Sequence, residues 1–317
     1  MRIDVHAHVW TDDYLDLLEE YGKTDTATQR GLGAGLDDKE LEARFALMDS
    51  AGVTHQVISA PPQSPHFADP AHALRAARFV NDQYAEVLRR RPDRFLAFAS
   101  LPLPHTDLAL EEMTRALDDL GMSGVCLTTS VLGRSIADPD FDLLYGELDR
   151  RGTVLYIHPA GCGAGSPLIS QHRLTWSIGA PIEDTVAIMG LILAGVPSRF
   201  PRMRILASHL GGALPMLLQR ADNQVGWEAP DTPEKPSLAA RRLWYDSVGH
   251  GHVPALRAAV QSFGADRIVL GTDFPYEAGD LFRTAVDYVG QAGLEPGQAE
   301  LILEANALDL LGLSRTG

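Results

Sequence analysis

The sequence predicts an α/β fold, a single (β/α)₈ TIM barrel over residues 1–317 with an extra helix at its C-terminal end. Three observations predict it. Short apolar or β-branched runs alternate with longer segments of helical periodicity, and this alternation continues from one end of the chain to the other. No stretch rich in Pro, Gly or Ser divides the chain. Barrels of this kind fold as one unit even beyond about 250 residues, so the length suits one domain.

The predicted strands are the short runs in which β-branched and apolar residues dominate. They cover residues 3–5, 56–59, 95–100, 124–128, 154–158, 204–208, 243–248 and 267–271. A barrel of this type is closed by eight parallel strands, so the number of runs agrees with the fold class.

The predicted helices lie between these runs and show an apolar periodicity near 3.6 residues. They cover residues 37–50, 69–91, 107–120, 140–151, 182–196, 213–225, 253–263 and 278–293, and a last helix covers residues 296–311. Glycine follows several of them, as Gly152 and Gly264 do, where a left-handed C-cap is favoured. Two glycine-rich stretches, residues 21–36 and 161–178, are predicted to be loops over the barrel mouth.

Composition excludes several classes of protein. The net charge is −15 and the basic residues form no stripe, so nucleic acid is not an expected partner. The N-terminus lacks the long apolar segment of a signal peptide, and we expect a cytoplasmic protein. The apolar stretch 186–196, bounded by Glu183-Asp184, is too short to cross a membrane and predicts a core helix. Cys126 and Cys162 are expected to be buried thiols without a site role.

Four of the eight predicted strands end in a histidine or an aspartate. The first ends in His6 and His8, the fifth in His158, the sixth is followed by His209, and the eighth leads into Asp273. The carboxyl ends of the strands build the active site of a barrel, so these side chains should meet. Because alternate strand residues face the same side, His6 and His8 should both point into the barrel mouth.

This set of side chains predicts a site for one divalent metal ion. Three imidazoles and a carboxylate with open coordination positions suit Zn²⁺ best, with Mn²⁺ and Fe²⁺ as alternatives. A second metal would require a bridging ligand such as a carboxylated lysine after the fourth strand. The three lysines, Lys23, Lys39 and Lys235, all lie in polar loops or at helix edges. Spacing alone does not distinguish His209 from a further ligand.

Several short motifs together resemble one known family. The chain resembles the aminocarboxymuconate-semialdehyde decarboxylase and γ-resorcylate decarboxylase branch of the amidohydrolase superfamily, over essentially its whole length. The resemblance is carried by Ile3-Asp4-Val5-His6-Ala7-His8, Met48-Asp49-Ser50-Ala51-Gly52-Val53, Asn81-Asp82, Pro92-Asp93-Arg94-Phe95, Ala99-Ser100-Leu101-Pro102, Leu120-Gly121, His158-Pro159, Phe200-Pro201, His209-Leu210-Gly211-Gly212-Ala213-Leu214-Pro215, Leu270-Gly271-Thr272-Asp273-Phe274-Pro275-Tyr276 and Asn306-Ala307.

The resemblance implies a role for each site residue. His6, His8, His158 and Asp273 bind the metal, and His209 stays unligated beside the metal-bound water, where it acts as the general acid/base together with Asp273 as a candidate proton donor. A metal lowers the pKa of its water towards about 7, and a neutral imidazole can exchange that proton.

The resemblance also implies a substrate anchor and an assembly. Arg220 falls where these decarboxylases have an arginine that reaches a neighbouring subunit's site and binds a substrate carboxylate, which predicts a homodimer. A second arginine of the semialdehyde decarboxylase has no clear match, with Arg30 as the nearest candidate. The tryptophan that often follows His-Pro in the family is missing after Pro159, and Trp176 is a candidate to fill that space.

The predicted reaction is non-oxidative decarboxylation of a small unsaturated or aromatic carboxylic acid. The alternative is hydrolysis of a lactone or amide, or hydration of an unsaturated acid, by the metal-activated water with His209 as base. Both reactions fit one site, because the barrel and its ligands fix the metal rather than the substrate. A non-catalytic barrel that binds a metal or a small acid is a third hypothesis, which the intact ligand set disfavours.

Overall fold

A closed barrel of parallel strands forms the centre of the molecule. The structure is a computed structural model that describes residues 1–314. The strand order in its main sheet is β1-β2-β3-β4-β7-β8-β9-β10. The strands are β1 (Ile3–His8), β2 (His55–Ser59), β3 (Phe95–Ser100), β4 (Gly124–Thr128), β7 (Val154–His158), β8 (Arg204–Ala207), β9 (Trp244–Asp246) and β10 (Ile268–Val269). The amide of Val5 donates to the carbonyl of Leu270 at 2.8 Å, which joins the last strand to the first. The predicted (β/α)₈ barrel is confirmed.

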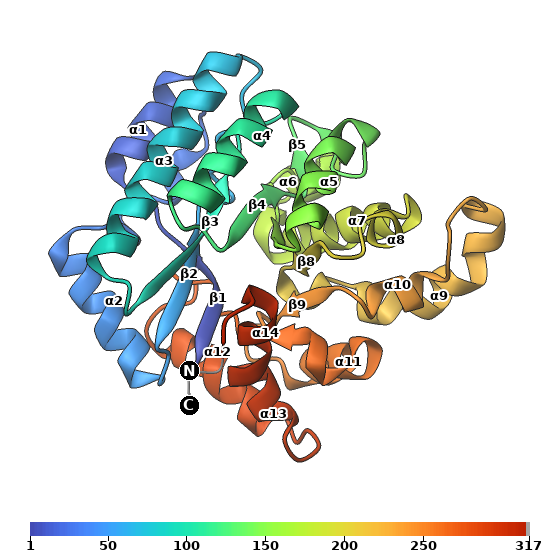
Figure 1. Ribbon diagram of the computed structural model, residues 1–317. Helices are drawn as coiled ribbons and strands as arrows, with labels where there is room; N and C mark the ends of the chain where they lie inside the picture. The colour runs from blue at the N-terminus through green and yellow to red at the C-terminus, as the bar shows by residue number, and fades with distance from the viewer. Residues whose placement is uncertain (315–317) are drawn as a thin grey trace.

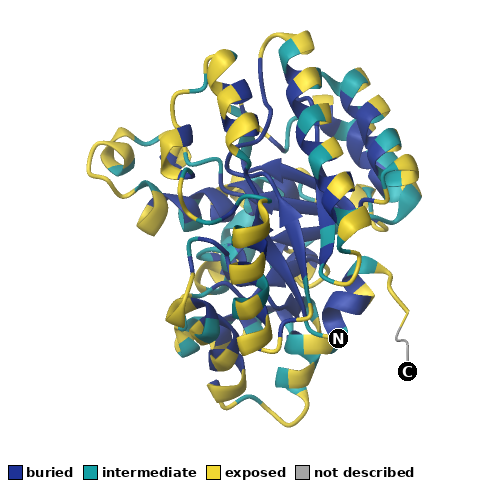
Figure 2. Cartoon of the chain, turned by 90° about the vertical axis from the view of Figure 1, so that its left-hand side faces the viewer, coloured by how far each residue is buried: buried dark blue, intermediate teal, exposed yellow. Residues whose placement is uncertain are grey.

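Helices surround the strands on the outside of the barrel (Figure 1). They are α2 (Asp38–Ser50), α3 (Pro70–Arg90), α4 (Thr106–Thr114), α5 (Asp142–Arg151), α7 (Ala180–Leu193), α9 (Leu214–Glu228), α11 (Val253–Phe263) and α12 (Asp280–Gln291). Figure 2 shows buried strands in the middle and exposed residues on the outward faces of the helices. Gly152 ends α5 with a φ of 60°, the left-handed cap that its position predicted.

The core has two layers. One layer lies between strands and helices, and the other fills the barrel with side chains such as Val57, Phe98, Tyr156 and Leu206. The short helix α14 (Asn306–Leu311) adds Ala307, Leu308 and Leu310 to this inner layer. The extra C-terminal helix therefore closes the end of the barrel away from the strand tips.

The structure corrects some of the predicted boundaries. The helix α1 (Asp12–Glu20) was not predicted; Thr11 caps it by accepting from the amide of Tyr14, and its apolar side packs into the core. Residues 161–178, predicted to be a loop, contain a turn at Gly163–Gly165, the helix α6 (Pro167–Ser170) and a π-helical turn Thr175–Gly179 that continues into α7. Such short helices carry too few residues to show a period in the sequence.

Smaller elements were also absent from the sequence prediction. They are a turn at Thr26–Thr28, the strands β5 (Ser130–Val131) and β6 (Arg134–Ser135), the helices α8 (Val196–Arg199) and α10 (Pro236–Ala240), and short turns at Pro139–Phe141, His209–Gly211 and Ala265–Arg267. The π-helical turns at Arg115–Asp119 and Leu301–Ala305 and the helix α13 (Gln298–Glu300) lie within the predicted helices 107–120 and 296–311. None of them interrupts the alternation of strands and helices.

One expectation about burial was wrong. Cys126 is buried as expected, but Cys162 is exposed because it lies in the loop after β7. His66 is also buried and lies 3.2 Å from the hydroxyl of Thr128. A loop residue that folds back under the strand tips cannot be recognised from local sequence.

One helical run among residues 1–314, Thr175–Leu193, is long and apolar enough by composition to cross a membrane. Its residues Ile188, Leu191 and Ile192 belong to the core between strands and helices. Glu183 and Asp184, the predicted polar boundary of this stretch, are themselves buried within the helical run. The run is a core helix, as the sequence predicted.

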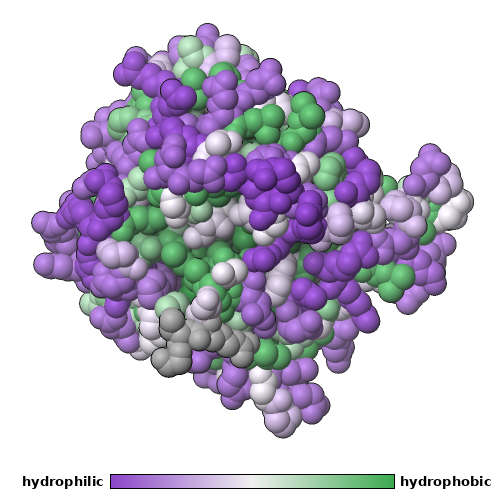
Figure 3. Space-filling view, in the orientation of Figure 1, coloured by the Kyte–Doolittle hydropathy of each residue, from purple (hydrophilic) through white to green (hydrophobic). Residues whose placement is uncertain are grey.

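The molecular surface carries both hydrophilic and hydrophobic side chains. Figure 3 shows hydrophilic side chains around the face seen in Figure 1 and hydrophobic side chains near its centre. Hydrophobic side chains also reach the surface of α9, where Met216 is 85% and Trp227 72% exposed. This helix therefore offers apolar area that the described chain leaves uncovered.

Candidate functional site

Four side chains converge at the tips of the first, fifth and eighth strands of the barrel. One nitrogen each from His6, His8 and His158 and one carboxylate oxygen from Asp273 lie within 4.8 Å of one another, and all four residues are buried. The rings of His6 and His8 are 5.1 Å apart, and those of His6 and His158 are 5.0 Å apart. The structure therefore brings together the four residues that the strand tips predicted.

These atoms fit a single metal ion. The nitrogens His6 Nε2 and His158 Nε2 are buried without a well-formed hydrogen bond. A buried polar atom without a partner costs about 1–3 kcal/mol, which a coordination bond would offset. Ligands bound about 2.0–2.2 Å from a common ion lie roughly 3–4 Å from each other. His6 Nε2 and His8 Nε2 each lie 3.1 Å from Asp273 Oδ1. The residues present thus suit a divalent ion held by nitrogen and oxygen.

The backbone of β1 and of the segment after β10 sets this arrangement. The pairing of β1 with β2 shifts register between Asp4 and Ala7, next to His6. Asp273 has a φ of 60°, and its amide donates to the carbonyl of His6 at 2.9 Å. A non-glycine residue in the left-handed region is costly and is often found at functional sites. Here it turns the carboxylate back towards the histidines.

Burial and charge set the protonation of the cluster. Burial lowers the pKa of His8 to about 4 and that of His158 well below its ordinary value. Burial opposes protonation of His6 as well, but the charges of Asp273 and Asp246 outweigh it and raise its pKa to about 9. Burial would raise the pKa of Asp273, yet His6 and His209 hold it well below its usual range. A carboxylate among imidazoles is the state that binds a cation.

The carboxylate of Asp246 orients His6. Asp246, at the end of β9, accepts from His6 Nδ1 at 2.7 Å, which fixes the tautomer that leaves Nε2 free to bind a metal. Its other oxygen accepts from the amides of His209 and Val248 at 2.9 and 3.0 Å. Asp246 therefore links the metal ligand His6 to the segment that carries His209.

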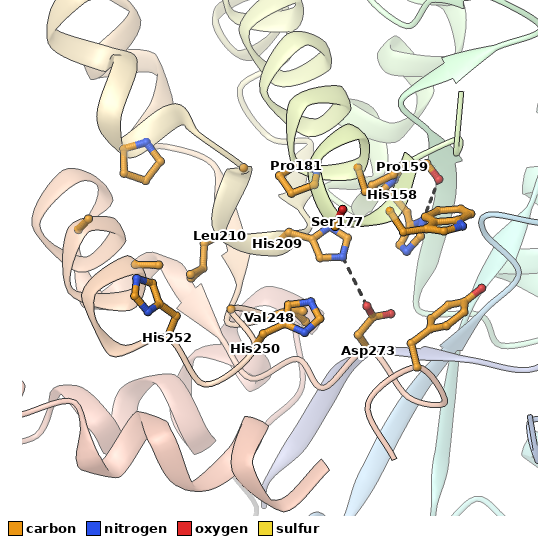
Figure 4. Close-up of a pocket in the computed structure, with 18 of the residues that line it drawn as sticks. His158, Pro159, Ser177, Pro181, His209, Leu210, Val248, His250, His252 and Asp273 are labelled. Carbon is orange, nitrogen blue, oxygen red and sulfur yellow. Dashed lines mark hydrogen bonds and ion pairs between the residues drawn. The ribbon is translucent and has the colours of Figure 1, made fainter. Parts of the chain in front are cut away.

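His209 lies beside the cluster rather than in it. Its Nδ1 is 2.8 Å from Asp184 Oδ2, and its Nε2 is 3.6 Å from Asp273 Oδ2, as the dashed line in Figure 4 marks. Ser208 donates to the second oxygen of Asp184 at 2.8 Å. Burial raises the pKa of Asp184 to about 6. Burial opposes the charge on His209, but Asp184 outweighs it and raises the pKa of that imidazole well above its ordinary value.

A cavity of 820 Å³ opens directly above these groups. His158, His209 and Asp273 face it from the barrel, and Figure 4 shows His250 and His252 on its wall. The remaining lining is mainly apolar and comes from the starts of α7, α9 and α11 and from Trp176 and Tyr276, among others. Apolar walls with a few convergent polar groups are typical of a site for a small organic molecule.

Glu183, in the first turns of α7, holds the loop after β7. It accepts from the amides of Ala160, Gly161 and Gly163 at 2.7–3.1 Å and from the hydroxyl of Thr129 at 2.9 Å. The loop follows immediately after the ligand His158. A buried carboxylate with four donors is well satisfied, so Glu183 fixes one side of the cavity.

Of the remaining predicted residues, one lines the cavity and another lies away from it. Trp176 lines the cavity, stacks on Tyr276 with ring centres 6.4 Å apart, and packs on Gly161, so it occupies the space beside the His-Pro motif. Arg30 lies at the surface, where it pairs with Asp12, Asp16 and Glu19.

Arg220 is exposed on α9 and is not part of the cavity lining. Within residues 1–314 its side chain makes no hydrogen bond or ion pair. It takes no part in the site of its own chain.

Sequence reasoning missed the residues that support the site. Asp246 ends β9, as His8 and His158 end their strands, and this shared position was a usable signal. Asp184 and Tyr276 carried no such signal, because the first lies within a helix and the second in a loop. Asp184 reaches His209 only when α7 packs on the barrel, and Tyr276 reaches His8 only when the loop after β10 folds over the strand tips.

Comparison with known proteins gives consistent matches over the whole chain. The family model described as amidohydrolase matches residues 3–313. The 2-amino-3-carboxymuconate-6-semialdehyde decarboxylase of Dictyostelium discoideum is 28% identical over 336 aligned positions, covering 99% of this chain and 92% of that protein. The gamma-resorcylate decarboxylase of a Rhizobium species is 30% identical over 262 positions, covering 74% of this chain and 77% of that protein.

A solved structure shares the fold. The dihydroxybenzoic acid decarboxylase of a Polaromonas species, with bound manganese and the inhibitor 2-nitroresorcinol, superposes with a TM-score of 0.82 at 23% identity. The match covers 98% of this chain and 96% of that one.

Proposed function

The chain belongs to the amidohydrolase family, and from this membership we propose that it is a metal-dependent carboxy-lyase, which decarboxylates a small aromatic or unsaturated carboxylic acid. The observation that carries the proposal is the buried cluster of His6, His8, His158 and Asp273 beneath an 820 Å³ cavity with His209 on its wall. The curated relatives described above are both decarboxylases, so hydrolysis and hydration are not favoured.

The four clustered residues would hold one ion, which we propose to be zinc, with manganese as the alternative. Three imidazoles and one carboxylate suit zinc, while the Polaromonas relative carries manganese. When bound, the ion would neutralise a carboxylate and an adjacent oxygen of the substrate. The apolar cavity wall excludes water from the rest of the substrate, which strengthens every charge interaction there.

His209 and Asp273 would supply the proton that the substrate carbon receives. Decarboxylation requires a proton on the carbon that bears the carboxylate, after which the carbon–carbon bond breaks and CO₂ leaves. Asp184 fixes His209 through Nδ1, so its Nε2 faces Asp273 Oδ2 at the cavity. We propose that this pair supplies the proton. In Asp273→Asn with its metal retained, full activity would exclude Asp273 as the proton donor.

We propose that Arg220 serves the site of a partner subunit in a homodimer. In its own chain the side chain is exposed and away from the cavity, and neighbouring residues of α9 and α7 such as Met216 and Val186 expose apolar area that a partner would bury. Arginine suits this role because its planar fork binds carboxylates through two parallel bonds.

A mixing experiment tests the arginine. Arg220→Ala and His209→Ala homodimers should each lack activity, whereas a mixture allowed to exchange subunits should regain about a quarter of the wild-type rate, since half of the dimers are mixed and hold one complete site. No recovery in a verified mixed dimer would remove Arg220 from the partner's site.

The proposed activity is tested by metal content and CO₂ release together. The purified protein is analysed for zinc and manganese and then assayed with hydroxybenzoates and muconate-like acids. One equivalent of metal with CO₂ release is the expected result. One equivalent with water uptake into a lactone, amide or unsaturated acid instead of CO₂ release would establish the hydrolase or hydratase.

A further inference from the structure

A histidine and a buried glutamate form a pair on the cavity wall beside the metal cluster. His250 Nδ1 lies 2.6 Å from Glu277 Oε1. The side chain of Glu277 is only 3% exposed, whereas that of His250 is 70% exposed. Figure 4 shows the His250 ring on the cavity wall between His252 and Asp273. The pair therefore presents an imidazole to the cavity and holds it from below with a carboxylate.

The loop that carries His250 is held in an unusual conformation. His250 has a φ of 49° and Gly251 follows with 72°, so two successive residues lie in the left-handed region. For a histidine the left-handed backbone conformation costs roughly 1 kcal/mol or more, whereas a glycine adopts it without this cost. His250 lies in the loop between β9 and the start of α11, and in this backbone conformation its ring faces the cavity.

The pair places a cationic donor on the cavity wall at a position separate from His209 and the metal cluster. Among residues 1–314, no arginine or lysine lines the cavity, and Arg30 is bound to surface carboxylates. Glu277 raises the pKa of His250 through its close contact, which favours the imidazolium form. With Nδ1 engaged by Glu277, the remaining N–H donor of that imidazolium is on Nε2, which is available to an acceptor oxygen.

We infer that His250, positioned by Glu277, binds a second oxygen of the substrate, away from the carboxylate that the metal cluster holds. The inference rests on the proposed function and narrows its substrate class. The preferred acid carries a phenolate, hydroxyl or carboxylate oxygen in addition to the group bound at the cluster. An acid without that oxygen leaves the donor of His250 unpaired and binds more weakly.

Two classes of probe test this selectivity. Salicylate offers only a carboxylate and its adjacent hydroxyl, and the dihydroxybenzoates add one further hydroxyl at different ring positions. Calorimetry with the metal-loaded enzyme gives the dissociation constant of each probe, and CO₂ release gives kcat and KM. At least one dihydroxybenzoate should bind about 10-fold more tightly than salicylate, because a hydrogen bond to a charged group contributes about the free energy that this ratio requires.

His250→Ala should abolish that preference while the affinity for salicylate changes less than about twofold. Glu277→Gln should lose most of the preference, and the double variant should lose no more than His250→Ala does, because the two residues act as one unit. His250→Gln keeps an N–H donor at a similar reach and should retain part of the preference. His172→Ala is the control: it removes an exposed histidine that does not line the cavity, and it should keep the wild-type ratio.

Metal content and circular dichroism of each variant establish that the site and the fold are intact. An unchanged ratio in His250→Ala, or a wild-type enzyme that does not discriminate between the probes, would overturn the inference. Selective binding that depends on His250 without CO₂ release from any probe would support the inference and remove the proposed decarboxylation. CO₂ release together with a salicylate-to-dihydroxybenzoate affinity ratio that does not depend on His250 would support the proposed decarboxylation and overturn the inference about His250.

Discussion

At the scale of single residues, the site depends on two carboxylates that touch neither metal nor cavity directly. Asp246 fixes His6, and Asp184 fixes His209, each through the Nδ1 of the imidazole. Both aspartates are fully buried. An imidazole can turn about its side-chain bonds, and a buried acceptor holds it in one orientation and one tautomer. The two histidines are therefore placed before any ligand arrives.

Replacing Asp246 with Asn should weaken metal binding. The amide is a poorer acceptor than the carboxylate for His6 Nδ1, and losses of about 10–100-fold in metal affinity follow from such changes behind a ligand. A competition titration with a zinc chelator measures the effect. Asp222→Asn, on α9 outside the site, is the control and should bind metal as the wild type does. Equal affinity in Asp246→Asn would contradict a positioning role.

Replacing Asp184 with Asn should change the pH dependence of the reaction. Burial raises the pKa of Asp184 to about 6, so the carboxylate that orients His209 is lost as the pH falls through that value. The wild-type kcat/KM should therefore decline on the acid side near this pH. Asp184→Asn should be slow at every pH and lack this acid limb, with its metal content unchanged. An acid limb that persists in the variant would assign it to another group.

At the scale of elements, loops after the strands are fixed by the helices that follow. The loop after β7 has three amides that donate to Glu183 of α7, so one side chain ties the loop next to His158 to the helix. The loop after β10 is held instead by a turn of its own, in which the amide of Tyr276 donates to the carbonyl of Asp273 at 2.9 Å. One loop of the site is thus fixed by the following helix and the other by its own turn.

Glu183→Ala should destabilise the protein by about 3 kcal/mol, because the partly buried amide of Gly161 and the buried amide of Gly163 lose their acceptor. Urea unfolding monitored by fluorescence measures the free energy of unfolding. Glu228→Ala, at the exposed end of α9, is the matched control and should stay within about 0.5 kcal/mol of the wild type. A loss in Glu183→Ala no larger than in the control would show that the loop finds other acceptors.

At the scale of the whole molecule, the metal cluster joins distant parts of the barrel. Its ligands come from β1, from β7 and from the segment after β10, so an ion bound there would link the first, fifth and last strands. A ligand that binds only the folded state stabilises it in proportion to the logarithm of its concentration over the dissociation constant. Metal occupancy and stability should therefore change together.

Removing the metal should lower the melting temperature. An ion present at about 100 times its dissociation constant adds roughly 2.7 kcal/mol, which for a chain of this size corresponds to several degrees. Scanning calorimetry with and without a chelator measures the shift, and added zinc should restore it. His158→Ala lacks one ligand and should show little shift. An equal shift in that variant would place the stabilising ion elsewhere.

Much of the architecture could be predicted because it depends on local patterns in the sequence. The periods of strands and helices gave the eight-stranded barrel, and the motifs gave the family, and both predictions are confirmed. The cluster of His6, His8, His158 and Asp273 followed from one rule, that strand carboxyl ends meet at one end of a barrel. Zinc, the homodimer, the single-domain organisation, the cytoplasmic location and the roles of His209 and Arg220 remain predictions.

The sequence by itself determined the fold class, the family and the residues that gather at the strand tips, because these depend on periodicity and on position along a strand. Only the tertiary structure decided that Asp184 and Asp246 orient two histidines, that Trp176 lines the cavity, and that His250 pairs with Glu277. Those contacts join residues from separate elements and depend on how helices and loops pack on the barrel, which no local pattern encodes.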